Sequence, residues 1–125
     1  MNLNQVTLPA LDMAASVAFY RGMGFRQIVD APHYARFECP EGGATFSVHR
    51  VDEAPVNPGV VIYFESDRLD ALVEELQREG FAFAQLPRDE RWLWREARIC
   101  DPTGNTICLY HAGENRRNPP WRVSS

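Results

Sequence analysis

An internal repeat of about half the chain constrains the fold more than any other feature of this 125-residue sequence. A Gly-Phe pair occurs at Gly24-Phe25 and again at Gly80-Phe81, an offset of 56 residues. The same offset aligns the strand candidate 5–8 with the strand candidate 61–64. A chain that repeats one supersecondary unit is expected to fold as two similar modules.

Each half is predicted to be a βαβββ module. The last strand of each half, 43–49 and 104–110, alternates apolar and polar side chains, and the two match at an offset of 61 residues. The larger offset predicts a longer connection in the second half, between residues 81 and 98. The other strands are expected near Arg26–Val29, Tyr34–Cys39, Phe81–Gln85 and Trp94–Cys100.

These elements predict one α+β domain over residues 1–112, with modules spanning about 1–54 and 57–112. Residues 50–59, which contain Pro55 and Pro58, are expected to be the linker, and residues 113–125 an irregular tail.

Two helices are predicted from capping residues and apolar spacing. The first begins after Asp12, a good N-cap, and ends at Gly22 and Gly24. The second is expected to open at Ser66–Asp67, to place four apolar side chains on one face and to stop at Gly80.

Strand alternation divides the side chains of the repeated strands between two faces. Apolar side chains of one parity are expected to cover the helix of their own half. The other parity gives a mixed polar and apolar set: Gln5, Thr7, Ser47, His49, Val61, Tyr63, Cys108 and Tyr110. Buried polar groups need partners, so this mixture favours a face that lines a small-molecule pocket. A wet groove without ligand and a face covered by a partner subunit are the alternatives.

Composition excludes several classes of function. Thirteen Lys and Arg against 17 Asp and Glu give a formal net charge of −4, which argues against general nucleic-acid binding and favours neutral or cationic ligands. The longest apolar run, 59–64, is too short to span a bilayer, and no export signal is recognisable, so a cytoplasmic location is expected. Three cysteines cannot all pair, and we expect reduced thiols.

Two segments carry a family pattern. Residues 12–25, DMAASVAFYRGMGF, combine an acidic cap, a Phe-Tyr pair and a Gly-Phe pair, and residues 101–109, DPTGNTICL, combine a turn and a strand. Together they resemble the helix signature and the closing turn of the vicinal oxygen chelate superfamily, which includes glyoxalase I, bleomycin-resistance proteins and extradiol dioxygenases. The resemblance covers essentially residues 1–111. It implies paired βαβββ modules whose mixed sheets curve around a cleft, and a homodimer.

The resemblance also implies where metal-using members hold their ion. The four ligand positions, mostly His and Glu in those members, fall on Gln5, Ser47, Val61 and Cys108. An amide, an alcohol, an isopropyl group and a thiol do not supply the donors that hard divalent ions need. We therefore expect the usual metal site to be absent, and no cofactor. A zinc site that joins His49 to Cys108 and Gln5 is the alternative.

A pair of tryptophans is the second candidate feature. On an extended chain Trp92 and Trp94 share a face, where their indoles either stack a planar or cationic ligand or fill the wide connection or a dimer seam. Glu96 and Arg98 share that parity and are expected to form an ion pair.

Three residues of the first half, His33, Tyr34 and Arg36, precede or occupy a strand that lines the same cleft. Any of them is able to bind a polar substrate group. In the tail, Trp121 either belongs to a disordered basic end or folds back over the cleft mouth or onto a second subunit.

The sequence favours a metal-independent small-molecule binder of the bleomycin-resistance kind. In this hypothesis Tyr63, Trp92, Trp94 and Tyr110 form the walls, and Gln5, Ser47, His49 and Cys108 orient the ligand. The second hypothesis is a lyase, isomerase or dioxygenase with a relocated metal or an acid/base site on His49. The third is a structural or interaction module whose strand face is covered by another protein.

Overall fold

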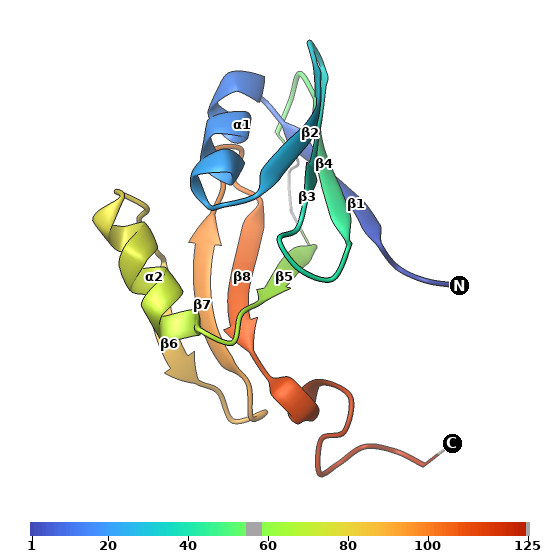
Figure 1. Cartoon of the computed structure of the whole chain (residues 1–125), viewed down its shortest axis with the longest axis vertical. Coiled ribbons are helices and arrows are strands. Elements are labelled where there is room, and N and C mark those ends of the chain that lie inside the picture. Colours follow the sequence, from blue (N-terminus) through green and yellow to red (C-terminus); the bar gives the residue numbers. More distant parts are fainter. Residues whose placement is uncertain (55–58, 125) are drawn as a thin grey trace. The chain divides into compact units, whose positions relative to one another are not determined.

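The computed structural model describes residues 1–54 and 59–124 and confirms the repeated βαβββ order (Figure 1). The elements are β1 (Gln5–Ala10), α1 (Met13–Gly22), β2 (Arg26–Ala31), β3 (Tyr34–Glu38), β4 (Thr45–Arg50), β5 (Val61–Glu65), α2 (Leu69–Arg78), β6 (Gln85–Asp89), β7 (Arg95–Cys100), β8 (Thr106–His111) and a short 3-10 helix, η1 (Gly113–Arg116). The predicted linker loses Arg50 to β4, and its Pro55 and Pro58 lie outside the described residues. Within the described residues, no helix has the length and apolar character needed to cross a membrane.

The two sheets share one topology, with strand orders β1-β4-β3-β2 and β5-β8-β7-β6. In each sheet the first strand pairs in parallel with the last, and the other pairs are antiparallel. Thr7 is in register with Ser47 across β1 and β4, and Tyr63 is in register with Cys108 across β5 and β8. Cross-strand partners project from the same face, so each mixed sheet gathers its predicted polar set on one face.

The chain forms two compact units. Unit 1 is Met1–Gly59 together with Asp101–Asn105, and unit 2 is Val60–Cys100 together with Thr106–Ser125. The turn that follows β7 in the sequence is therefore part of unit 1.

The core of unit 1 lies between α1 and its sheet. α1 begins as predicted, because the Asp12 carboxylate accepts a hydrogen bond from the Ala15 amide at 3.0 Å. Tyr20 projects from α1 onto the sheet, where its ring packs edge-on against Phe46 with centroids 5.0 Å apart. Phe37 stacks on Phe46 at 5.2 Å, so one aromatic cluster fills this core.

The Asp101–Asn105 turn is joined to α1 and β1 by buried hydrogen bonds. Asp101 Oδ2 accepts from the Tyr20 hydroxyl at 2.6 Å and from Asn105 Nδ2 at 2.8 Å. Its Oδ1 accepts from the backbone amides of Thr103 and Asn105. Asn105 Nδ2 also donates to the Pro9 carbonyl at 2.9 Å. Burial, helped by the Asp101 charge, raises the pKa of Tyr20 far above its ordinary value, so this phenol stays a donor.

α2 of unit 2 begins later than predicted. Its N-cap position is Arg68, without a side-chain cap, and Ser66 instead accepts a hydrogen bond from the Arg68 amide at 3.1 Å. The prediction that the helix opens at Ser66–Asp67 is therefore wrong, since the N-cap is Arg68 and the helix begins at Leu69. Of the four side chains of the predicted apolar face, Leu69, Val73 and Leu76 are buried and Leu72 is half-buried.

The strand predicted over Phe81–Gln85 is also misplaced. The Phe81 amide donates to the Leu76 carbonyl at 3.0 Å, which holds the chain against the end of α2. The first contact with β7 comes at Ala84, whose amide donates to the Arg98 carbonyl at 2.8 Å, and β6 starts one residue later. Residues 81–84 thus connect the end of α2 to β6.

Replacing Asp101 by Ala is expected to destabilise the protein by about 3 kcal/mol, because several buried donors lose their acceptor together. Tyr20→Phe removes one donor and is expected to cost about 1 kcal/mol. Urea unfolding measures both values, with Asp52→Ala as the matched control, since the Asp52 side chain is 93% exposed. A loss for Asp101→Ala no larger than that of the control contradicts this role.

Candidate functional site

The strand face of unit 1 opposite α1 carries a hydrogen-bonded polar network. The Ser47 side chain is fully buried; its Oγ accepts from Gln5 Nε2 at 2.8 Å and shares a 2.5 Å hydrogen bond with the Tyr34 hydroxyl. Arg36 Nε donates to the same Tyr34 oxygen at 2.9 Å, and Thr45 Oγ1 donates to Gln5 Oε1. The structure therefore brings together Gln5 and Ser47, two of the predicted site residues.

The Tyr34 phenol is more acidic than an ordinary tyrosine. The hydrogen bond from Ser47 contributes most to lowering the pKa of Tyr34, and the Arg36 guanidinium adds to it by hydrogen bonding and by charge.

His49, the candidate catalytic residue, lies at the exposed end of β4, in register with Tyr34. Within the described residues no hydrogen bond or ion pair joins it to Gln5 or Ser47. Its proposed role as an acid or base stays a prediction.

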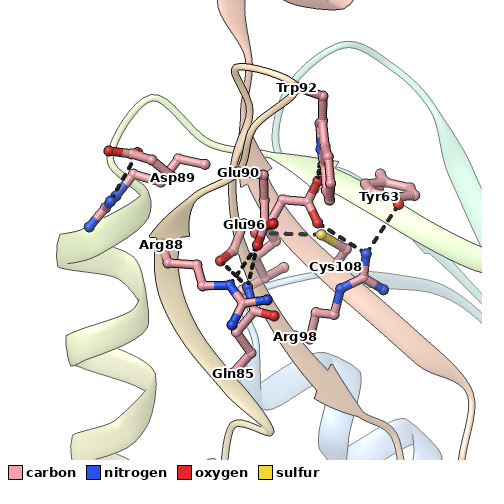
Figure 2. Close-up of polar contacts among 11 residues, drawn as sticks. Tyr63, Gln85, Arg88, Asp89, Glu90, Trp92, Glu96, Arg98 and Cys108 are labelled. Atoms are coloured by element: carbon pink, nitrogen blue, oxygen red, sulfur yellow. Dashed lines mark hydrogen bonds and ion pairs between the residues drawn. The ribbon is translucent and has the colours of Figure 1, made fainter.

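The strand face of unit 2 is organised around the buried carboxylate of Glu96 (Figure 2). Glu96 Oε1 accepts from Arg98 Nη2 at 3.0 Å, and Oε2 accepts from Trp92 Nε1 at 2.7 Å. The Cys108 thiol is hydrogen-bonded to the same carboxylate. Arg98 Nη2 also reaches the Tyr63 hydroxyl at 3.4 Å. The expected ion pair between Glu96 and Arg98 is confirmed, within one strand.

Cys108 is a protonated thiol in this setting. Burial raises its pKa to about 12, and the nearby negative charge of Glu96 acts in the same direction. A thiol that keeps its proton at neutral pH is a poor nucleophile.

Three aromatic rings form a cluster beside Glu96. Trp94 stacks on Tyr110 with centroids 4.8 Å apart, and Tyr63 meets both rings edge-on at 5.8 and 5.4 Å. Tyr63 is 41% exposed whereas Tyr110 is buried, so the cluster has one solvent-facing edge. We call Tyr63, Trp94 and Tyr110 the aromatic cluster.

Trp92 is separate from this cluster, and the extended segment predicted to align it with Trp94 is not present. The chain turns between them: Leu93 has a φ of +69°, and its amide donates to the Glu90 carbonyl at 3.0 Å. Trp92 reaches the site through Glu96 and remains 37% exposed.

The C-terminal segment supports the aromatic cluster. Glu65 Oε2 accepts from the backbone amides of Ala112 and Gly113 at 2.7 and 2.9 Å, at the start of η1. The Asn115 carbonyl of η1 accepts from Trp94 Nε1 at 3.2 Å. The predicted irregular tail therefore includes an ordered turn. Trp121, beyond η1, is 57% exposed.

The four positions matched to metal ligands present few free donors. Ser47 Oγ is shared between Gln5 and Tyr34, Val61 has no donor atom, and Cys108 is buried and protonated. Among the described residues, no group of three His, Cys, Asp or Glu side chains is placed to hold a metal ion. This donor set does not fit a hard divalent ion.

The central role of Glu96 and the hydrogen bonds from the Ala112 and Gly113 amides to Glu65 were not predicted. The repeat contains a signal for the former: Glu96 and Arg98 on β7 correspond to Tyr34 and Arg36 on β3 at an offset of 62 residues. Glu65 has no such signal, because its partners are backbone amides 47 and 48 residues away in sequence.

The three cysteines are expected to differ in reactivity. Iodoacetamide at neutral pH should modify the exposed Cys100 first and leave Cys108 unmodified, because Cys108 is buried and protonated. Peptide mass spectrometry of native protein measures the order, and urea-unfolded protein, in which all three react, is the control. Equal labelling of Cys108 and Cys100 in native protein contradicts this assignment.

Glu65 is expected to make stability depend on pH in mild acid. Burial alone would raise its pKa, but the Ala112 and Gly113 amides, with His111 and Arg116, lower it below its ordinary value. The stabilisation is then complete above the unfolded pKa of about 4.3 and is lost as the pH falls through the lower folded value. Urea unfolding over this range should show a weaker pH dependence for Glu65→Gln than for wild type, whereas Glu74→Gln, at an exposed position, should behave as wild type. Parallel curves for Glu65→Gln and wild type exclude this contribution.

The comparisons identify relatives of this fold. A structure of a glyoxalase/bleomycin resistance protein/dioxygenase from Nocardioides has a TM-score of 0.80 at 22% identity, covering 99% of this chain and 90% of that one. Lactoylglutathione lyase from Agrobacterium tumefaciens has a TM-score of 0.73 at 19% identity, covering 88% and 92%. A bleomycin-binding protein complexed with bleomycin has a TM-score of 0.72 at 15% identity, covering 89% and 98%.

A search of curated protein sequences finds no significant match. The sequence of residues 2–109 matches the model of one protein family. The chain belongs to the Glyoxalase/Bleomycin resistance protein/Dioxygenase superfamily.

Proposed function

We propose that the protein binds a small planar molecule at the aromatic cluster of unit 2, without a divalent metal at the positions that metal-using relatives employ. The observation that carries this proposal is the state of those positions. Ser47 Oγ already makes hydrogen bonds to Gln5 and Tyr34. Val61 has no atom that can coordinate a metal, and the Cys108 thiol, with a pKa of about 12, is protonated at neutral pH. A cation would have to displace these protons and hydrogen bonds to bind.

The aromatic cluster supplies the binding surface in this proposal. The exposed edge of Tyr63 lies beside the half-buried indole of Trp94, which is itself held by Tyr110 and by the Asn115 carbonyl. Rings that are already oriented lose little conformational entropy when a planar ligand stacks on them. The polar groups of Arg98 and of the Tyr63 hydroxyl lie at the border of the cluster and favour a ligand with hydrogen-bonding atoms on its rim.

The relatives support a small-molecule ligand in two different ways. One similar structure is that of a bleomycin-binding protein, and another is that of a lactoylglutathione lyase. The donor set of this chain favours the binding role, because chemistry through a metal needs an ion that these residues do not suit. The net charge of −4 is consistent with a ligand that is not a nucleic acid. The homodimer implied by the resemblance is part of this proposal.

A thermal-shift screen with planar aromatic amides and heterocycles, benzamide among them, tests the proposal. A compound that stabilises wild type should bind Trp94→Leu about fivefold to tenfold more weakly, because the stacked indole is lost. Leu86→Ala is the matched control, since Leu86 is an exposed apolar residue of the same unit and should leave binding unchanged.

Metal analysis of protein purified without chelator completes the test. We expect much less than one equivalent of transition metal per chain. About one equivalent of metal per chain in wild type, and none in the His49→Ala variant, would favour the enzyme hypothesis with a relocated metal. No stabilising compound at all, with tight capture of a protein partner, would favour an interaction module.

A further inference from the structure

Strand β3 of unit 1 and strand β7 of unit 2 present equivalent side-chain pairs. Arg36 on β3 is in register with Ser47, and Arg98 on β7 is in register with Cys108, which is the repeat equivalent of Ser47. Two residues earlier, β3 carries Tyr34 where β7 carries Glu96. The two arginines therefore occupy the same place in the same topology but have different neighbours.

The difference concerns charge. Arg98 is neutralised inside unit 2, because its Nη2 lies 3.0 Å from the carboxylate of Glu96. Arg36 has instead the neutral phenol of Tyr34 as its hydrogen-bond partner, and the guanidinium carbon lies 5.4 Å from the centre of that ring. Among the described residues, no ion pair includes Arg36.

The groups around Arg36 leave its charge uncompensated. In register with it are Val29 on β2 and Ser47 on β4, neither of which is charged. Glu38, two residues along β3, lies 3.7 Å from Arg26 on the neighbouring strand and is paired there. Arg36 is half-buried, so it is also less hydrated than a surface arginine.

The guanidinium is held in an orientation that leaves its far edge available. Nε is fixed by the Tyr34 hydroxyl, which Ser47 holds in turn. Over the described part of the chain, Nη1 and Nη2 of Arg36 make no hydrogen bond. These two parallel donors match the two oxygens of a carboxylate, and such bidentate pairs are among the stronger charge-assisted hydrogen bonds.

We propose that Arg36, oriented by Tyr34 and Ser47, is a binding site on unit 1 for the carboxylate group of a small molecule. The site goes beyond the proposed function and is independent of it, because it uses none of the residues of the aromatic cluster. It also reverses, locally, the preference for neutral or cationic ligands that the net charge of −4 suggests.

The experiment compares benzoate with benzamide, which share a ring and differ in charge. Nuclear magnetic resonance follows the Nε–H signal of Arg36 and the indole signals of Trp92 and Trp94 during titration at constant ionic strength. Benzoate should shift the Arg36 signal, and sodium chloride at the same ionic strength should not. Arg36→Gln should weaken benzoate binding about tenfold and leave benzamide binding unchanged.

Variants at Tyr34 test the charge argument directly. Tyr34→Glu gives unit 1 the carboxylate that unit 2 has, and should abolish benzoate binding while leaving Arg36 in place. Tyr34→Phe removes the orienting hydroxyl without adding charge, and should weaken benzoate binding less than Tyr34→Glu does. Arg36→Lys keeps the charge but loses the two parallel donors, and should bind benzoate with an affinity between wild type and Arg36→Gln. Amide spectra confirm the fold of each variant.

An Arg36 signal unmoved by benzoate up to its solubility limit overturns the carboxylate site, as does equal benzoate affinity in wild type and Arg36→Gln. If benzoate and benzamide both shift only the Trp94 signals, the carboxylate site fails and the proposed function stands. If benzoate shifts Arg36 and no planar compound shifts Trp94, the proposed function fails and the carboxylate site stands.

Discussion

The buried carboxylate of Asp101 is the interaction on which the packing of unit 1 depends. It accepts hydrogen bonds from a phenol on α1, from an amide side chain and from two backbone amides of its own turn. Asn105 extends this network to the Pro9 carbonyl in β1. These hydrogen bonds offset the cost of burying the carboxylate, and loss of any one donor would leave part of its charge without a partner in the interior. The two segments that carry the family resemblance are thus physical partners, and the sheet below them positions Ser47 and Arg36.

Unit 2 uses a buried carboxylate differently. Glu96 gathers the side chains of Trp92, Arg98 and Cys108 on one strand face, while Glu65 binds the backbone of the C-terminal segment that holds Trp94. These acidic groups accept hydrogen bonds from the Trp92 indole, the Arg98 guanidinium and the backbone amides of Ala112 and Gly113. Much of the polar part of the face is therefore hydrogen-bonded within the protein, and in the aromatic cluster Tyr63 remains exposed. This is the physical basis for a ligand that binds by stacking.

Much of the fold could be predicted because its signals are local or repeated. The Asp12 cap and the alternation around Ser47 need only a few neighbouring residues, and the Gly-Phe pairs recur at a fixed offset. The structure bears out the βαβββ order. The predicted start of α2, the predicted strand 81–85 and the predicted extended chain from Trp92 to Trp94 are wrong. Each of these regions is decided by a contact between elements or by a backbone angle, which alternation cannot detect. The same holds for the candidate site. Parity predicted that Gln5 and Ser47 share one face, where the structure joins them by a hydrogen bond. The neutralisation of Arg98 but not of Arg36 depends on one residue in each strand, Glu96 in β7 and Tyr34 in β3.

The membership of residues 101–105 in unit 1 has a consequence for the history and the handling of this chain. The sequence contains two tandem repeats, but the two compact units do not coincide with them. Unit 1 includes the Asp101–Asn105 turn, which lies in the second repeat. A polypeptide ending after β4 would expose the Tyr20 phenol with no acceptor and the Pro9 carbonyl with no donor. We therefore expect a separately made first half to lack these two buried hydrogen bonds and to gain them only when the segment that contains Asp101 and Asn105 is added.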